Sequence, residues 1–182
     1  MSYNVFFRPT KAFRSAIEDP SIGKALLIVI VTSILLSFIV YMVNANPISA
    51  GVIALLNIAQ WFVISALLWF FGLIFVRKKR HLIDKEFMGM ATVTGKLWLL
   101  NLSSAILFII ALVSQNVIVI SIIVVLLFIL GIMLVVDSFK MIRVTLEIET
   151  IKTIIPWILF IVLYLLIVIF ASLATNALLA VA

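Results

Sequence analysis

The side chains that could hold a polar solute lie in or beside the longest apolar stretches of this chain. Asn57 and Gln60 share one helical face at i and i+3, Asn101 lies in a later stretch, and Asp137 ends the next one. Amides and carboxylates in such surroundings either hydrogen-bond neighbouring helices, at roughly 0.6–2 kcal/mol per bond, or mark a solute or ion pathway. The pattern therefore predicts interhelical hydrogen bonds, with a small oligomeric transporter or channel as the alternative.

Residues for covalent or metal chemistry are scarce. The chain has one histidine, His81, no cysteine and seven acidic residues. Asp84 and Glu86 lie close enough in sequence to share a cation, but no third ligand accompanies them. The motifs of zinc proteases, serine hydrolases, P-loop nucleotide binding and dinucleotide binding are absent. We therefore expect a protein that is not an enzyme and has no catalytic residue, metal site or cofactor.

The densest charge is the run VRKKRHLIDK at 76–85. A nucleic-acid or nuclear-localisation patch has this composition, but basic residues beside apolar spans also contact anionic headgroups. The second interpretation explains the other basic segments as well, so we expect no nucleic acid partner. The candidate contact residues for anionic lipid or a partner protein are Arg8, Lys11, Arg14, Arg77, Lys78, Lys79 and Arg80.

The elements that must position these residues are membrane helices. Of the 182 residues, 66% are hydrophobic, and the mean hydropathy is +1.43, whereas soluble domains are about half apolar. The runs 25–43 and 117–136 contain no charge, and a helix of about 20 such residues crosses a bilayer. The composition predicts an all-α, polytopic membrane protein with a single membrane domain over residues 1–182.

Five transmembrane helices are predicted. The least obvious division falls at 114–116, where Ser-Gln-Asn interrupts the apolar stretch 96–139. One helix over that stretch would be roughly 66 Å long, about twice the hydrocarbon thickness of a bilayer, so a tight hairpin is favoured. The predicted spans are 25–43, 52–76, 96–113, 117–139 and 156–176.

The basic residues predict the orientation of these spans. All 13 Lys and Arg fall on alternate segments: four before the first span, six in 77–96 and three in 140–155. Cytoplasmic loops carry such an excess, so the N-terminus is expected in the cytoplasm and the C-terminus outside. This topology puts Asn57 and Gln60 near the outer ends of the helices, and Asn101 and Asp137 near the inner ends. The expected location is the cell membrane, or an endomembrane in a eukaryote.

An amphipathic helix is predicted at 9–20, before the first span. Pro9 suits the first turn of a helix, and Pro20 ends the pattern. The apolar arc of this helix consists of Ala12, Phe13, Ala16 and Ile17. Such a helix is expected to lie in the headgroup plane or to pack on the inner ends of the bundle, and the two positions are compatible.

Two further inner segments, 81–96 and 138–156, show partial helical periodicity. Gly89 and Gly95 weaken a continuous helix in the first of them. Either a helix or a solvated loop is compatible with each segment. Trp98 and Trp157 follow these segments, where an inner aromatic belt is expected.

The layout resembles the Yip1-domain family in its short prokaryotic form. The resemblance covers about residues 5–176 and depends on three features. They are the lead-in FFRPTKAFRSAIEDP, with Pro9, Phe13 and Pro20; the aromatic-rich QWFVISALLWFFGLIF at 60–75; and the arrangement of the last three spans. It implies a polytopic protein without catalysis. Eukaryotic relatives look like adaptors of early secretory membranes that engage Rab-type GTPases, but their Asp-Leu-x-Gly-Pro motif is absent here.

The function expected from these features is that of a non-enzymatic membrane adaptor or organiser. The resemblance implies a role related to trafficking. The protein would act through its cytoplasmic rim, which we define as residues 5–24, 77–96 and 140–155. Its expected partners are a bilayer with anionic headgroups and either a membrane protein or a second copy of the chain.

Overall fold

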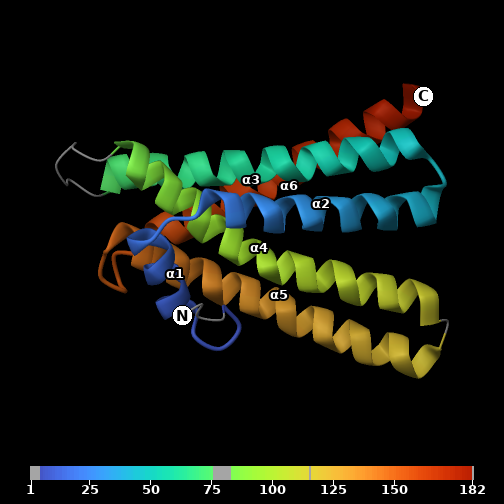
Figure 1. Ribbon diagram of the computed structural model, residues 1–182, viewed down its shortest axis with the longest axis horizontal. Coiled ribbons are helices and arrows are strands. Elements are labelled where there is room, and N and C mark those ends of the chain that lie inside the picture. The colour runs from blue at the N-terminus through green and yellow to red at the C-terminus, as the bar shows by residue number, and fades with distance from the viewer. Residues whose placement is uncertain (1–4, 76–82, 115, 182) are drawn as a thin grey trace.

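Every element of regular structure in the part of the chain that is described is a helix (Figure 1). The computed structural model describes residues 5–75, 83–114 and 116–181. The helices are α1 (Pro9–Glu18), α2 (Ile22–Asn44), α3 (Pro47–Phe75), α4 (Ile83–Ser114), α5 (Val117–Leu146) and α6 (Ile154–Val181).

The long helices α2 to α6 run along the long axis of the molecule, and the short helix α1 lies across one end (Figure 1). Among the described residues, four helices are long and apolar enough to cross a membrane: Ile22–Asn44, Pro47–Ile74, Phe87–Ser114 and Val117–Leu146. The segment Ile154–Phe170 of α6 is a shorter apolar helix. The prediction of an all-α chain with several membrane-compatible helices is confirmed.

Two tight turns lie at the end of the bundle opposite α1 (Figure 1). In each, an asparagine caps the following helix. Asn46 Oδ1 accepts hydrogen bonds from the backbone N–H groups of Ile48 at 2.9 Å and Ser49 at 3.3 Å. Asn116 does the same for α5, accepting from Ile118 N at 2.9 Å. Asparagine is among the best N-cap residues because its side chain satisfies otherwise unpaired backbone donors. The hairpin predicted at 114–116 is confirmed.

Helix α4 begins at Ile83, much earlier than the predicted span at 96–113. It continues through Gly89 and Gly95, the residues expected to weaken it. A Cβ built on Gly95 would lie only 2.4 Å from Ala25 Cβ on α2. The missing side chain at Gly95 therefore permits a close helix contact, and this packing offsets the poor helix propensity of glycine.

Helix α1 packs its apolar face against α4 and α5. Ala12, Phe13 and Ala16 are almost completely buried. Lys96 on α4 also donates a 2.8 Å hydrogen bond from Nζ to the backbone oxygen of Ala12. The expected packing of this helix on the end of the bundle is confirmed, because its apolar face is covered by α4 and α5.

Candidate functional site

Asn57 on α3 joins three helices. Its Nδ2 donates to Ser33 Oγ on α2 at 2.7 Å, and its Oδ1 accepts from Trp98 Nε1 on α4 at 3.3 Å. The side chain is buried, with 7% of the residue exposed. Both ends of the amide are therefore used in contacts between helices, which is the first of the two roles predicted for it.

Two further polar contacts follow Asn57 along the same face of α3, at successive steps of four residues. Trp61 Nε1 donates to the backbone oxygen of Ala91 at 3.3 Å. Ser65 Oγ and Thr94 Oγ1 share a 2.6 Å hydrogen bond. All of these residues are buried. We name Asn57, Trp61, Ser65 and their partners on α4 the polar seam.

Sequence reasoning missed the polar seam, although the i, i+4, i+8 spacing of Asn57, Trp61 and Ser65 was a usable signal. Trp98, which was expected in an aromatic belt, does not face the surroundings of the bundle. Trp98 is 2% exposed and lies inside the bundle, where Asn57 satisfies its indole N–H. A buried tryptophan usually finds such a partner.

Gln60 and Asn101 do not join Asn57 in one polar group. Gln60 is half-buried and forms a side-chain hydrogen bond with Tyr164 on α6. Asn101 is half-buried in the middle of α4, one turn from Trp98. Because α4 begins thirteen residues before the expected span, at Ile83, Asn101 lies near the middle of this helix and not near its beginning.

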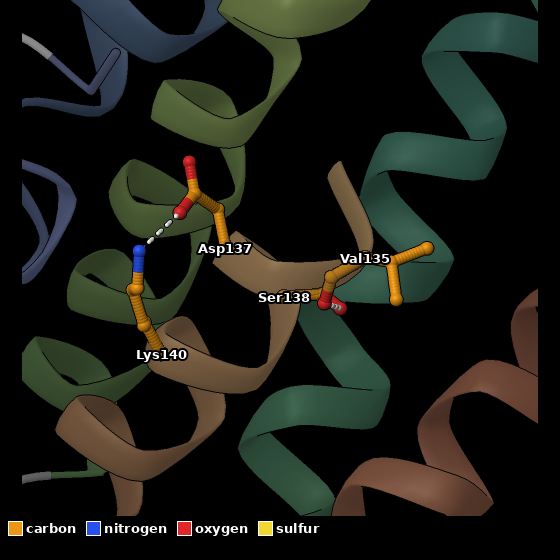
Figure 2. A network of polar contacts seen from close by, with 4 residues as sticks. All are labelled: Val135, Asp137, Ser138 and Lys140. Atoms are coloured by element: carbon orange, nitrogen blue, oxygen red, sulfur yellow. Dashed lines mark hydrogen bonds and ion pairs between the residues drawn. The ribbon is translucent and has the colours of Figure 1, made fainter. Parts of the chain in front are cut away.

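Asp137 lies near the C-terminal end of α5, where it is 3% exposed. Its Oδ1 accepts from Lys140 Nζ at 3.1 Å, and among the described residues its Oδ2 has no hydrogen-bond partner. Figure 2 shows Asp137 and Lys140 on one side of α5 and Ser138 on another. Ser138 Oγ accepts from Trp157 Nε1 at 3.0 Å, which ties α5 to the beginning of α6. Asp137 is thus a buried member of an ion pair whose lysine reaches solvent.

Three of the seven basic residues predicted to contact lipid or a partner lie in the described part of the chain, at the α1 end of the bundle. Arg8, Lys11 and Arg14 are exposed on or just before α1. The other four candidates, in the run 77–80, lie outside the described residues.

A cavity of about 560 Å³ lies between α1 and the C-terminal end of α5. Its walls contain three cationic and two acidic side chains beside apolar ones. Lys140 and Arg143 were not among the predicted contact residues, but both lie on this wall with Arg14. The lining residues are Thr10, Arg14, Ile17, Glu18, Lys140, Arg143, Val144, Glu147 and Ile148.

Over the described ranges 5–75, 83–114 and 116–181, no three His, Cys, Asp or Glu side chains are grouped as a metal site. The structured polar groups are instead the polar seam within the bundle and the charged cavity at the α1 end. Comparison of the chain with protein-family models, curated proteins and solved structures gives no match.

Proposed function

We propose that this chain is a non-enzymatic membrane adaptor or organiser that acts through its cytoplasmic rim. In this proposal it crosses the cell membrane, or an endomembrane, five times, with the N-terminus in the cytoplasm and the C-terminus outside. Its resemblance to the Yip1-domain family is part of the proposal and implies a trafficking-related role. The partners are anionic lipid and a membrane protein or a second copy of the chain.

The docking of α1 carries the proposal. The apolar face of this helix is covered by α4 and α5, and Lys96 is bonded to its backbone. Arg8, Lys11 and Arg14 remain exposed. A folded, positively charged surface is therefore present before any partner binds. Each cation near an anionic surface is worth about 1 kcal/mol.

The length of α6 supports a fifth span. It has 28 residues, and at 1.5 Å per residue it is about 42 Å long, which exceeds the hydrocarbon thickness of about 30 Å. The end of α6 lies at the opposite end of the bundle from α1 (Figure 1). An odd number of crossings puts the two ends of the chain on opposite sides of the membrane, as this arrangement requires.

The topology can be tested with reporters that are active only outside the cytoplasm. A reporter at the C-terminus should be active and one at the N-terminus silent. Equal activity at both ends would contradict five spans.

Neutralising Arg77, Lys78, Lys79 and Arg80 to alanine should weaken this orientation or the binding of anionic lipid, since cations beside a span determine its cytoplasmic side. If neither changes, these four residues do not have the proposed role.

The adaptor role can be tested by crosslinking in cells and purification in mild detergent. The charge-reversal variant Arg8→Glu/Lys11→Glu should lose a stoichiometric partner that the unchanged chain retains. Asn44→Glu is the control, because it adds an acid at the exposed last residue of α2, and α2 ends at the end of the bundle opposite α1 (Figure 1). Retention of the same partners by the variant would contradict the role of this surface.

The alternative function, a small oligomeric transporter or channel, predicts a different result in the same experiment. Isolation of a homo-oligomer without any other protein would remove the support for an adaptor of another membrane protein. Solute flux in liposomes would then be compared between the unchanged chain and the variants Gln60→Leu and Asn101→Leu. These half-buried amides suit that test better than Asn57, whose hydrogen bonds favour a packing role.

A further inference from the structure

We propose that the cavity between α1 and α5 binds the phosphate group of a glycerophospholipid whose acyl chains lie along α5. This inference rests on the proposed membrane location of the chain. It goes beyond general attraction to anionic lipid, because it assigns one built site to one lipid molecule.

The cationic wall of the cavity suits a phosphate group. Arg14 comes from α1, whereas Lys140 and Arg143 come from α5 at i and i+3. A guanidinium group can donate two parallel hydrogen bonds to phosphate oxygens, and an ammonium group adds a point charge. Because the cations come from two elements, a phosphate between them would be held from both sides. The Thr10 hydroxyl adds a donor on the α1 side.

An exposed apolar stripe on α5 leads directly to these cations. It consists of Val125, Ile129, Ile132 and Val136, which are between 45% and 58% exposed. Their spacing of four, three and four residues continues to Lys140 and Arg143, so all six side chains share one helical face. A ligand with an acyl chain and a phosphate group matches this order along the helix.

The acidic residues in the cavity restrict the headgroup. Glu18 and Glu147 line the cavity together with the three cations, and Lys140 is also paired with Asp137 at 3.1 Å, so the site carries a formal net charge of at most +1. A phosphodiester with one negative charge complements that balance better than a phosphomonoester. The carboxylates favour headgroups that carry donors, such as an ammonium group or glycerol hydroxyls. We therefore expect phosphatidylethanolamine or phosphatidylglycerol to bind more tightly than phosphatidic acid.

Binding can be measured on the purified full chain in detergent by native mass spectrometry with short-chain phosphatidylethanolamine. The variant Arg14→Gln/Arg143→Gln should bind it at least tenfold more weakly. Lys152→Gln is the matched control, since Lys152 is an exposed cation on the loop after α5 and does not line the cavity. Equal binding by the variant and the unchanged chain would overturn the site. An equal loss in the control would show general charge attraction instead.

Competition separates a lipid from a soluble phosphate. Glycerophosphoethanolamine, the same phosphodiester headgroup without acyl chains, should not displace the lipid at concentrations at which short-chain phosphatidylethanolamine does. Equal competition by glycerophosphoethanolamine would overturn the assignment to a lipid.

A photoreactive phospholipid gives a second measurement on the unchanged chain and does not depend on any variant folding. Crosslinks should concentrate in residues 10–18 and 125–148, and an even distribution over the bundle would refute the site. A failure of the lipid site can also be distinguished from a failure of the proposed adaptor function. Loss of lipid binding in Arg14→Gln/Arg143→Gln with the protein partner retained concerns the lipid site alone. If no lipid binds but Arg8→Glu/Lys11→Glu loses its partner, only the lipid site fails.

Discussion

Among the glycines, Gly95 is the one at which an added methyl group should do the most damage. A Cβ at this residue would lie 2.4 Å from Ala25 Cβ and 2.8 Å from Ala25 Cα. Carbon atoms in contact prefer separations of about 3.5–4.0 Å. Gly95→Ala therefore requires α2 and α4 to move apart by roughly 1 Å. Neither side chain can avoid the clash by changing rotamer, because Ala25 contributes backbone atoms to it.

The expected magnitude follows from two opposing effects. Overpacking a tight interface costs about 1–3 kcal/mol, and a backbone contact belongs at the upper end of that range. Replacing glycine by alanine within a helix returns about 1 kcal/mol. We therefore expect Gly95→Ala to lower the free energy of unfolding by about 2 kcal/mol, which is more than a tenfold change in the folding equilibrium.

The free energy of unfolding can be measured in detergent by titration with a denaturing detergent, with tryptophan fluorescence as the signal. Trp61 and Trp98 are buried in the same part of the bundle, so their emission should report separation of α2, α3 and α4. Gly131→Ala is the control, since a Cβ there would have no atom within 4 Å. That substitution should leave the stability unchanged or slightly raised.

A second substitution tests the geometry itself. Ala25→Gly removes the methyl group at 2.4 Å but leaves the Cα at 2.8 Å. Combined with Gly95→Ala, it should recover part of the lost stability and not all of it. If Gly95→Ala is as stable as Gly131→Ala, the close approach of α2 and α4 is not present in the protein, and the reasoning fails.

Three further predictions concern polar groups. Asn57→Leu should lower the free energy of unfolding by about 1–2 kcal/mol, because it leaves two buried partners without their hydrogen bonds. Gln60→Leu, at a half-buried position, should lower it by less. Equal losses of stability in the same unfolding assay would contradict this prediction. Lys140→Met should destabilise the protein more than Asp137→Asn, because it leaves a buried carboxylate without its partner, whereas Asp137→Asn leaves a lysine that reaches solvent. Thermal unfolding in detergent gives the order of the two variants. The reverse order would refute the prediction. Asn116→Ala should cost about 0.5–2 kcal/mol and accelerate hydrogen exchange in the first turn of α5, and unchanged exchange would show that the cap has no role.

The positions of several helices could be predicted because their signals are local. The Ser-Gln-Asn break separates α4 and α5 where expected. The periodicity of 9–20 identified α1 and the face that is buried, because Ala12, Phe13 and Ala16 recur at helical spacing. Both signals come from residues that are neighbours in the chain, so they can be interpreted without knowing the tertiary structure.

The early beginning of α4 could not be predicted in the same way. Gly89 and Gly95 are poor helix formers, and their spacing predicted a weakened helix. In the structure each faces a residue of another element, Ile17 of α1 and Ala25 of α2 respectively. The stabilising contact comes from residues far away in the sequence, so no local pattern reveals it. The cavity was missed for the same reason, because Arg14 and Arg143 meet only after α1 has docked.

The sequence by itself determined that this chain forms long apolar helices and that its cations gather on alternate connecting segments. Those properties are sums over neighbouring residues, and neither depends on how the helices are arranged. The tertiary structure alone decided what each polar group faces. Asn57 bonds Ser33 and Trp98, and Asp137 is buried beside an exposed lysine. Such contacts depend on the rotation and depth of every helix relative to its neighbours. In these nearly uniform apolar helices, close packing at residues such as Gly95 sets that rotation, because hydrophobicity differs little from one face to another.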